Sequence, residues 1–486
     1  MKIVFTICFL IFCVQGYSRT VITGSGHGAV ILNNMDGLKP GDTLAIRAGQ
    51  YEKGGYFSRL TGITIINYKG IVDFGNTVTV GNLKMVSISG AGWKDAMYGI
   101  RFRNFQGDAF VLEAPCRSLS LSYCEYRDLD GNAFNASQFF ITYTGDSSTF
   151  ALYKTAFYYQ KLVHARALFV GSWAACKLFQ NVVDSIAFLH IIVDSTSSDV
   201  VQVIGSSIYR MLASHWRITG PCPNGKHDAG IFQTTGNGTV CNIYRYGGYG
   251  YVWRSWNLGL NGRADCYLYN CIDLNSDNYG TVDTRMQWYD TTTGNTIPFV
   301  RGANMHVLNN TSGNKRAPNY VSQIVVAGDF CASSGYRLEI RNNIAFNTIA
   351  TGADQLVKQN TPEPIPDTSN NLYAKDPITA GILLDTIECQ LNPDGPAIDR
   401  GISYSFIPAD IDGVPRPLGK SDIGAREFQK ALIIQDPNQG GFPKKWQVLS
   451  AAGIGIVLLT LALMKMSRKN GKKSNILFQG QPQKRI

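Results

Sequence analysis

The 486-residue sequence predicts an all-β protein, and within that class a right-handed parallel β-helix, on two observations. Charged residues make up only 16% of the chain and Gly occurs 50 times, a composition typical of many strands joined by turns. It excludes a disordered chain and a charge-rich helical protein. Short runs of alternating apolar and polar residues recur between Gly, Asn and Asp, as in the repeated rungs of a solenoid. These runs include 63–65, 78–80, 86–88, 100–102 and 119–121.

The formal net charge of +10 lies mostly in the C-terminal tail. Residues 465–486 hold seven Lys and Arg and no acidic residue, and Lys2 adds one more positive charge. The rest of the chain is therefore close to neutral. This gives no support to a nucleic-acid partner, which would be attracted by bulk positive charge.

Residues 1–18 predict a secretory signal peptide. Lys2 is a short positive region, an apolar run follows over 3–14, and small residues stand at Gly16 and Ser18. The run is short for a membrane span, so we expect it to be removed on export.

Residues 446–464 predict a single transmembrane helix. These 19 residues carry no charge and as a helix would cover about 28 Å, close to the hydrocarbon thickness of a bilayer. The basic tail after them places the C-terminus in the cytosol and the ectodomain in the periplasm or at the cell surface. The expected organisation is signal peptide 1–18, β-helix 19–360, closing segment 361–430, linker 431–445, transmembrane helix 446–464 and cytosolic tail 465–486.

The eleven Cys residues show no metal-binding pattern. No two have the CxxC spacing of a zinc or redox site, and nine remain after signal cleavage. In an exported chain, one or two disulfide bonds among them remain an alternative. The pattern favours buried apolar thiols.

The first elements predict a cap followed by the first rungs. Residues 29–35 predict a short capping helix, and 40–43 read PGDT before an apolar strand that ends at Gly49 and Tyr51. This order, with TIIN at 64–67, resembles the right-handed parallel β-helix proteins of the pectate-lyase-like superfamily. Further along, residues 136–175 are rich in Phe and Tyr, interrupt the pattern and predict an insertion.

The C-terminal part of the predicted ectodomain carries three linked motifs. Residues 397–401 read AIDRG, 410–417 read DIDGVPRP and 422–428 read DIGAREF. This series resembles the closing segment of many exported bacterial β-helix proteins, which is often followed by a surface anchor. The resemblance implies the fold and export, whereas activity does not follow from the fold.

Polar and aromatic side chains concentrate between residues 224 and 290. Positions one rung apart on a solenoid lie about 4.8 Å from each other. The intervals from Asp228 to Arg254 and from Arg254 to Asp283 are 26 and 29 residues, near one long rung each, so we expect these groups on one face. The candidate catalytic residues are Lys226, His227, Asp228, Arg254 and Arg285; the candidate sugar-binding residues are Trp253, Trp256, Trp288 and Tyr289; the candidate metal ligands are Asp277, Asp283 and Asp290.

Such a face suits an acidic polysaccharide. Cleavage by β-elimination needs a cation against the uronate carboxylate, a base for the adjacent proton and an acid for the leaving oxygen. Arg254 or Arg285 is the candidate cation, and Lys226 or His227 the candidate base. A Ca²⁺ held by the three Asp could replace the cation, and no other cofactor is expected. Hydrolysis instead needs two carboxylates about 5–9.5 Å apart, which the same Asp set could provide.

Two functions stay open at this point. One is a carbohydrate-active enzyme, a lyase, epimerase or hydrolase, and the other is a non-catalytic surface adhesion or structural protein. The membrane span favours the second. So does the absence of the pattern of related β-helix lyases, a Lys base in a Glu- and Asn-rich calcium setting with an Arg on a neighbouring rung. The polar and aromatic cluster favours the first. In either case we expect a monomer with a polysaccharide partner and membrane contact through the C-terminal helix.

Overall fold

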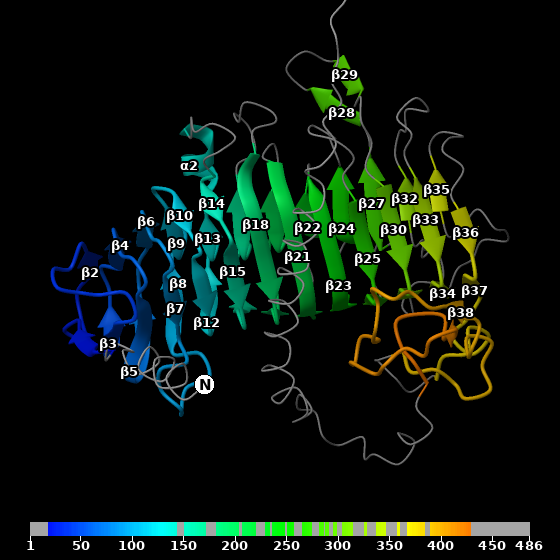
Figure 1. Cartoon of the computed structure of the whole chain (residues 1–486), viewed down its shortest axis with the longest axis horizontal. Coiled ribbons are helices and arrows are strands. Elements are labelled where there is room, and N and C mark those ends of the chain that lie inside the picture. Colours follow the sequence, from blue (N-terminus) through cyan, green and yellow to red (C-terminus); the bar gives the residue numbers. More distant parts are fainter. Residues whose placement is uncertain are drawn as a thin grey trace, which may run out of the picture. The chain divides into compact units, whose positions relative to one another are not determined.

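A computed structural model gives the structure of the chain (Figure 1). It describes residues 18–428 except 143–149, 172–180, 204–206, 220–228, 234–235, 248–249, 257–264, 275–280, 286, 291–294, 299–303, 314–324, 328–336, 347–356, 360–366 and 384–388. The chain divides into two units, 1–428 and 429–486, and all described residues belong to the first. The expected signal peptide up to residue 17, the linker from 431, the transmembrane helix and the basic tail lie outside the described residues. Among the residues that are described, no helix is long and apolar enough to cross a membrane.

The described strands form a parallel β-helix made of two long sheets. The smaller, sheet B, has twelve strands, and its neighbouring strands pair in parallel. They are β2 (Val30–Asn33), β4 (Gly55–Ser58), β6 (Val78–Gly81), β9 (Phe110–Leu112), β13 (Phe134–Asn135), β17 (Phe169–Gly171), β20 (Val201–Val203), β22 (Ala229–Gln233), β24 (Tyr251–Trp256), β27 (Val282–Arg285), β32 (Val325–Ala327) and β35 (Val357–Gln359).

The larger sheet has 23 strands and bends into two arms. Arm 1 contains β1 (Thr20–Thr23), β3 (Thr43–Tyr51), β5 (Thr64–Phe74), β7 (Ser87–Ser89), β11 (Ser120–Ser122), β15 (Thr155–Tyr158), β18 (Asn181–Leu189), β21 (Ser207–Ile218), β23 (Asn237–Tyr246), β25 (Asp265–Tyr269), β30 (Asn304–Leu308), β33 (Leu338–Arg341) and β36 (Asp367–Ser369). Arm 2 contains β8 (Ile100–Phe105), β12 (Cys124–Leu129), β16 (Lys161–Val163), β19 (Ile192–Val193), β26 (Ile272–Leu274), β31 (Thr311–Gly313), β34 (Ile344–Phe346) and β37 (Leu372–Ala374). The second halves of β3, β5, β21 and β23 complete arm 2.

The remaining elements are short. They are β10 (Cys116–Arg117) and β14 (Leu152–Tyr153), which pair with each other, the antiparallel pairs β28 (Gln287–Asp290) with β29 (Asn295–Pro298) and β38 (Gly401–Ile402) with β39 (Lys420–Ser421), and α2 (Ser137–Thr142).

Each rung buries every second side chain, so that inward residues stack in columns along the solenoid. On arm 2 the column includes Phe74, Phe102 and Tyr126, whose ring centroids lie 5.0 and 5.7 Å apart. These three side chains are at most 1% exposed. The parallel register predicted from the short alternating runs is therefore confirmed at the level of the fold.

The predicted capping helix over 29–35 is wrong, because Val30–Asn33 form strand β2 and pair with β4. Val30 and Leu32 are buried whereas Ile31 is 61% exposed, which is the period of a strand. Met35 and Leu38, in the turn that follows, pack against the core. These two side chains cover core surface where the helix was expected to do so.

The predicted insertion over 136–175 is also wrong for most of its length. Its described residues include β14, β15, β16 and β17, which belong to the repeated ladders. Phe157 and Phe169 lie in the core with their ring centroids 5.8 Å apart. The Phe-rich composition therefore reflects the core column, and α2 is the helical addition among the described residues of this stretch.

The expectation of buried thiols is confirmed for the Cys residues that the structure describes. Six are free and buried, namely Cys116, Cys124, Cys241, Cys266, Cys271 and Cys389. Burial raises the pKa of Cys116 and of Cys124 to about 12, which keeps both as unreactive thiols at neutral pH.

The turn between arms 1 and 2 repeats an unusual backbone conformation from rung to rung. Its central residue has a positive φ although it is not Gly, and over the second half of the solenoid that residue is Asn, which tolerates this conformation best. The residues concerned are Tyr123, Tyr159, His190, His215, Asn242, Asn270, Asn309, Asn342 and Asn370. We call the members from Asn242 to Asn370 the asparagine column.

Candidate functional site

The residues predicted between 224 and 290 are only partly described. Lys226, His227, Asp228 and Asp277 lie outside the described residues. For Trp256 and Arg285, and for Trp288, Tyr289 and Asp290 on β28, the structure describes the backbone but not the side chain. In the backbone register Trp256 pairs with Arg285, one rung apart on β24 and β27.

Arg254 and Asp283 meet as their 29-residue interval predicts. They are register partners on β24 and β27, and Arg254 Nε lies 3.1 Å from Asp283 Oδ2. The guanidinium also lies over the rings of Phe232 and Tyr251, at 5.3 and 5.1 Å from their centroids. The side chains of Arg254 and Asp283 are 14% and 0% exposed, respectively. A ligand therefore has little access to the guanidinium and none to the carboxylate in this conformation.

Trp253 is fully buried, because its position on β24 points inward. Its ring therefore packs in the core, where it offers no face to a sugar. Among the described residues no group of three or more His, Cys, Asp or Glu side chains is arranged to hold a metal ion. Since Asp277 and the Asp290 side chain lie outside the description, the proposed Ca²⁺ ligand set stays a prediction.

A more complete set of chemical groups lies on the outer face of arm 1. Tyr267 on β25, His306 on β30, Glu339 on β33 and Asp367 on β36 are successive register partners, one per rung. Parallel in-register pairing therefore brings together residues that span 100 positions of the sequence. We call this column and the side chains that contact it the arm 1 site.

Glu339 orients the imidazole of His306. His306 Nδ1 lies 2.6 Å from Glu339 Oε2, and a carboxylate can only accept, so Nδ1 carries the proton. The His306 ring stacks on Tyr267 with centroids 4.5 Å apart and planes 8° apart. In the neutral imidazole this contact leaves the lone pair on Nε2, and the side chain is 20% exposed.

A cation and a phenol complete the arm 1 site. Arg341 Nη1 lies 3.5 Å from Glu339 Oε1, and Arg341 Nη2 lies 2.5 Å from Asp367 Oδ2. Tyr404 donates its hydroxyl to Glu339 Oε1 at 3.1 Å. Burial, with the charge of Glu339 as a further cause, raises the pKa of Tyr404 to about 12, so the phenol keeps its proton at neutral pH.

Phe406 forms an apolar edge beside these groups. Its ring centroid is 5.4 Å from that of Tyr267 and 5.4 Å from that of Tyr404. The side chain is 46% exposed, whereas Phe74, Phe102 and Phe157 in the core are at most 1% exposed. An aromatic side chain offers a large apolar area, so an exposed ring beside polar groups can cover the apolar face of a ligand.

Tyr404 and Phe406 come from residues 389–428, which we call the C-terminal strap. The strap covers the outer face of arm 2, where Ile411, Ile423 and Ala425 pack with Ile272 and Ile344. It is also bound by the asparagine column. Asn342 Nδ2 donates to the carbonyl of Ile402 at 2.7 Å and its Oδ1 accepts from the Ile402 amide at 2.9 Å.

Two further asparagines bind the strap. Asn270 Nδ2 donates to the Ala409 carbonyl at 2.7 Å, and Asn309 Nδ2 donates to the Asp422 carbonyl at 3.4 Å. Because Asn342 fixes Ile402, two residues before Tyr404, the asparagine column sets where Tyr404 meets Glu339.

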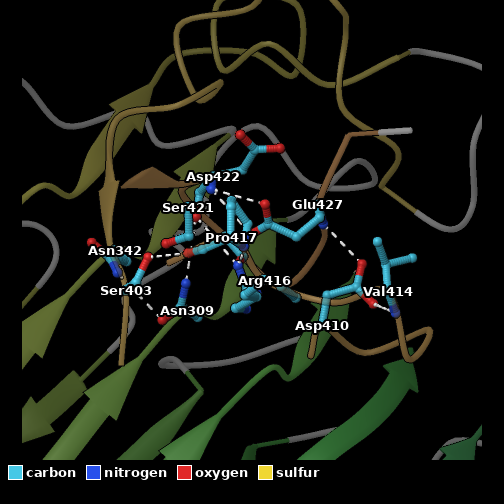
Figure 2. A network of polar contacts seen from close by, with 12 residues as sticks. Asn309, Asn342, Ser403, Asp410, Val414, Arg416, Pro417, Ser421, Asp422 and Glu427 are labelled. Atoms are coloured by element: carbon cyan, nitrogen blue, oxygen red, sulfur yellow. Dashed lines mark hydrogen bonds and ion pairs between the residues drawn. The ribbon is translucent and has the colours of Figure 1, made fainter. Parts of the chain in front are cut away.

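A buried charge network gives the strap its shape (Figure 2). Arg416, 2% exposed in its side chain, forms an ion pair with Glu427 and donates to the Gly424 carbonyl at 2.9 Å and to Asn270 Oδ1 at 2.9 Å. Glu427 accepts from the Asp422 amide, and its own amide donates to Asp410 Oδ2 at 2.8 Å. The DIDGVPRP and DIGAREF motifs are thus explained by structure: their charged residues build one network.

The network makes docking of the strap sensitive to pH. Burial raises the pKa of Glu427 from 4.5 to about 7, and burial also raises the pKa values of Asp410 and Asp422. A carboxyl whose pKa is raised in the folded state stabilises that state below its unfolded pKa and loses this contribution as pH rises through the folded value. The strap should therefore be more strongly protected at pH 5 than at pH 8.

Hydrogen exchange of residues 397–428 measures this dependence when the rates at each pH are expressed as protection factors relative to the unfolded chain. In Glu427→Gln, which keeps the shape without the charge, the pH dependence should shrink. Equal protection of the wild-type strap at both pH values would contradict the prediction.

The arm 1 site escaped the sequence argument because its residues are 28 to 39 positions apart and no motif joins them. A signal was present in the turn asparagines. Tyr267, His306, Glu339 and Asp367 each stand three residues before an Asn of the asparagine column. Alignment of the rungs on these Asn residues would have placed all four in one column.

Several solved structures match the chain. No protein-family model matches the sequence, and no curated protein matches it. Among solved structures the chain is similar to the crystal structure of pectate lyase Pel9A, at 11% sequence identity and a TM-score of 0.31, over 84% of this chain and 98% of that chain. The parallel β-helix is established by the strand register given above.

Proposed function

We propose that the chain is an exported, membrane-anchored β-helix protein that cleaves an acidic polysaccharide by β-elimination at the arm 1 site. The observation that carries the proposal is the His306–Glu339 contact, in which the carboxylate holds Nδ1 and leaves Nε2 as a proton acceptor. A neutral imidazole oriented by a carboxylate is a common form of general base.

The other roles follow from position and charge. Arg341 is the cation that neutralises the uronate carboxylate and so makes the adjacent C–H acidic. Tyr404, which keeps its proton at neutral pH, or Tyr267 on the other side of His306, protonates the leaving oxygen. Phe406 supports the sugar ring.

One observation favours a second candidate, a non-catalytic adhesion protein that binds polysaccharide. Arg341 is bound by both Glu339 and Asp367, so its charge is compensated before any ligand arrives. A surface with compensated charges and an exposed Phe406 suits binding without chemistry.

The two candidates are separated by one assay. The full-length protein, kept in mild detergent, is incubated with polygalacturonate, alginate and glycosaminoglycans while ultraviolet absorbance of unsaturated product and direct binding are both followed. Growth of absorbance supports the lyase, and binding without product supports the adhesion protein. If neither is observed with any acidic or neutral glycan, the polysaccharide proposal fails.

Export and anchoring are proposed from the sequence alone, on the signal-like residues 1–18 and the uncharged residues 446–464. The expected result is that a tag placed after Ile486 resists protease in intact cells while the β-helix is digested. Digestion of the tag from outside would reverse the topology.

A further inference from the structure

The corner between sheet B and arm 1 carries one exposed cation in each of five successive rungs. These residues, which we call the basic edge, are Lys39, Arg59, Lys84, Arg117 and Lys154. Each stands in the chain segment that leaves sheet B and leads into arm 1, before β3, β5, β7, β11 and β15 respectively.

The backbone register places these segments side by side. Lys84 forms parallel bridges to Thr61 in the rung before it and to Arg117 in the rung after it. Arg117 in turn pairs with Tyr153, the neighbour of Lys154. At the start of the edge, the amide of Gly41 donates to the carbonyl of Gly62 at 2.8 Å, which brings the segment of Lys39 beside that of Arg59.

The basic edge is not neutralised within the described part of the chain. None of its five residues takes part in a described ion pair, although ion pairs are frequent on the neighbouring arm 2, for example Arg103 with Asp73 and Arg127 with Glu125. Lys154 Nζ lies 5.2 Å from the centroid of Tyr153, a contact that leaves its charge uncompensated.

The acidic residues described in the same segments are few. Asp36 and Glu113 are exposed, and Asp42 is bound by Arg19. The corner therefore keeps an excess of positive charge on a chain whose body is close to neutral.

We propose that the basic edge is a binding track for a linear acidic polysaccharide that lies along the solenoid axis. Rungs repeat about every 4.8 Å, which is similar to the size of one sugar ring. Lys84 and Arg117 are register partners, and Arg59 and Lys154 stand close to that register in the rungs on either side. A glycan with one carboxylate on each sugar matches this spacing, with successive carboxylates meeting successive rungs. Exposed Lys and Arg side chains are long and adjust their reach, which tolerates small differences in pitch.

This track is separate from the arm 1 site. The basic edge occupies the rungs from β3 to β15, whereas the arm 1 site occupies those from β25 to β36. The inference goes beyond the proposed function and does not depend on His306, because a track can bind the glycan whether or not another surface cleaves it.

The test compares two triple variants of the full-length protein with the same loss of charge. The first is Lys84→Gln, Arg117→Gln and Lys154→Gln. The matched control is Lys53→Gln, Lys69→Gln and Lys94→Gln, three exposed lysines in other turns of the same part of the solenoid. Binding of polygalacturonate and of its fully methyl-esterified form is measured from low to high salt.

The wild type and the control should bind polygalacturonate, and the basic-edge variant should bind roughly tenfold more weakly or worse, as expected for the loss of three exposed charge contacts. Binding should fall with salt, because the Debye length shortens from about 10 Å at 0.1 M to about 3 Å at 1 M, and the esterified polymer should not bind.

Three results would overturn the inference. An equal loss in the control would show that bulk charge acts and position does not. Unchanged binding in the basic-edge variant would show that the basic edge does not bind the glycan. Binding of single-stranded DNA as tightly as polygalacturonate would assign the edge to nucleic acid. The two proposals fail separately. Unchanged binding in the basic-edge variant contradicts this inference whatever the cleavage assay shows, and absence of product from a wild type that still binds contradicts only the proposed cleavage.

Discussion

Arg416→Met should release the C-terminal strap from arm 2. The substitution removes the guanidinium that pairs with Glu427 in the network of Figure 2 and leaves the side chains of Asp410, Asp422 and Glu427 buried beside an apolar residue. Loss of one partner from a buried ion pair typically costs about 3–5 kcal/mol, because the remaining charge stays desolvated. Hydrogen exchange should then rise across 397–428 while the strands of the first rungs stay protected.

A matched control is available in the same segment. Arg400 is exposed on the strap, so Arg400→Met makes the same chemical change away from the network and should leave exchange unchanged. If Arg416→Met kept the protection of the wild type, the network would not be what holds the strap. Urea unfolding of both variants measures the accompanying loss of stability.

His306→Ala has the second large expected effect. Removing a general base that is already oriented by Glu339 should lower turnover of the polysaccharide by about 100- to 10,000-fold, with binding nearly unchanged. His164→Ala is the control, because His164 also places Nδ1 near a carboxylate, at 3.1 Å from Asp128 Oδ1. His164 is 70% exposed and lies on an earlier rung, away from the arm 1 site. Equal losses in both variants would show that His306 has no special role.

Glu339→Gln sharpens the assignment. The amide keeps the size of the side chain but removes the charge that fixes the proton on Nδ1, so the pH–rate profile should change as well as the rate. A profile identical to that of the wild type would mean that Glu339 supports the fold without setting the protonation of His306.

The repeated β-fold was accessible from the sequence because it depends on local patterns. The alternation that places Phe74 and Phe102 inside is visible in a few residues, and so is the preference of Asn for the turn. The prediction of a capping helix was wrong because strand pairing outweighed a local pattern that also fits a helix. Residues 29–35 are compatible with a short helix by length, but pairing of Val30–Asn33 with β4 provides hydrogen bonds and burial that an isolated turn of helix lacks.

The arm 1 site was not predicted from the sequence, because the register of the rungs decides which distant residues become neighbours. The interval from Arg254 to Asp283 gave the correct pairing, yet it gave no warning that both side chains would be covered. His306 and Glu339 meet through an interval of 33 residues, which differs from the 39 residues between Tyr267 and His306 because the connecting loops differ in length. Tyr404 comes from the C-terminal strap and not from a rung, so no interval between rungs predicts that it lies at this site.

The asparagine column also fixes how many rungs this part of the protein can contain. The strap meets Asn270 through Ala409 and Arg416, Asn309 through Asp422, and Asn342 through Ile402, so its bonds span three successive rungs at set positions. Duplication or loss of a rung between β25 and β33 would change the spacing between these contacts by a full repeat, so the strap could no longer make all of them. In a solenoid each repeat usually contacts only its neighbours, so nothing local sets the number of repeats. Here the strap contacts three rungs at once and so sets the number of rungs between Asn270 and Asn342.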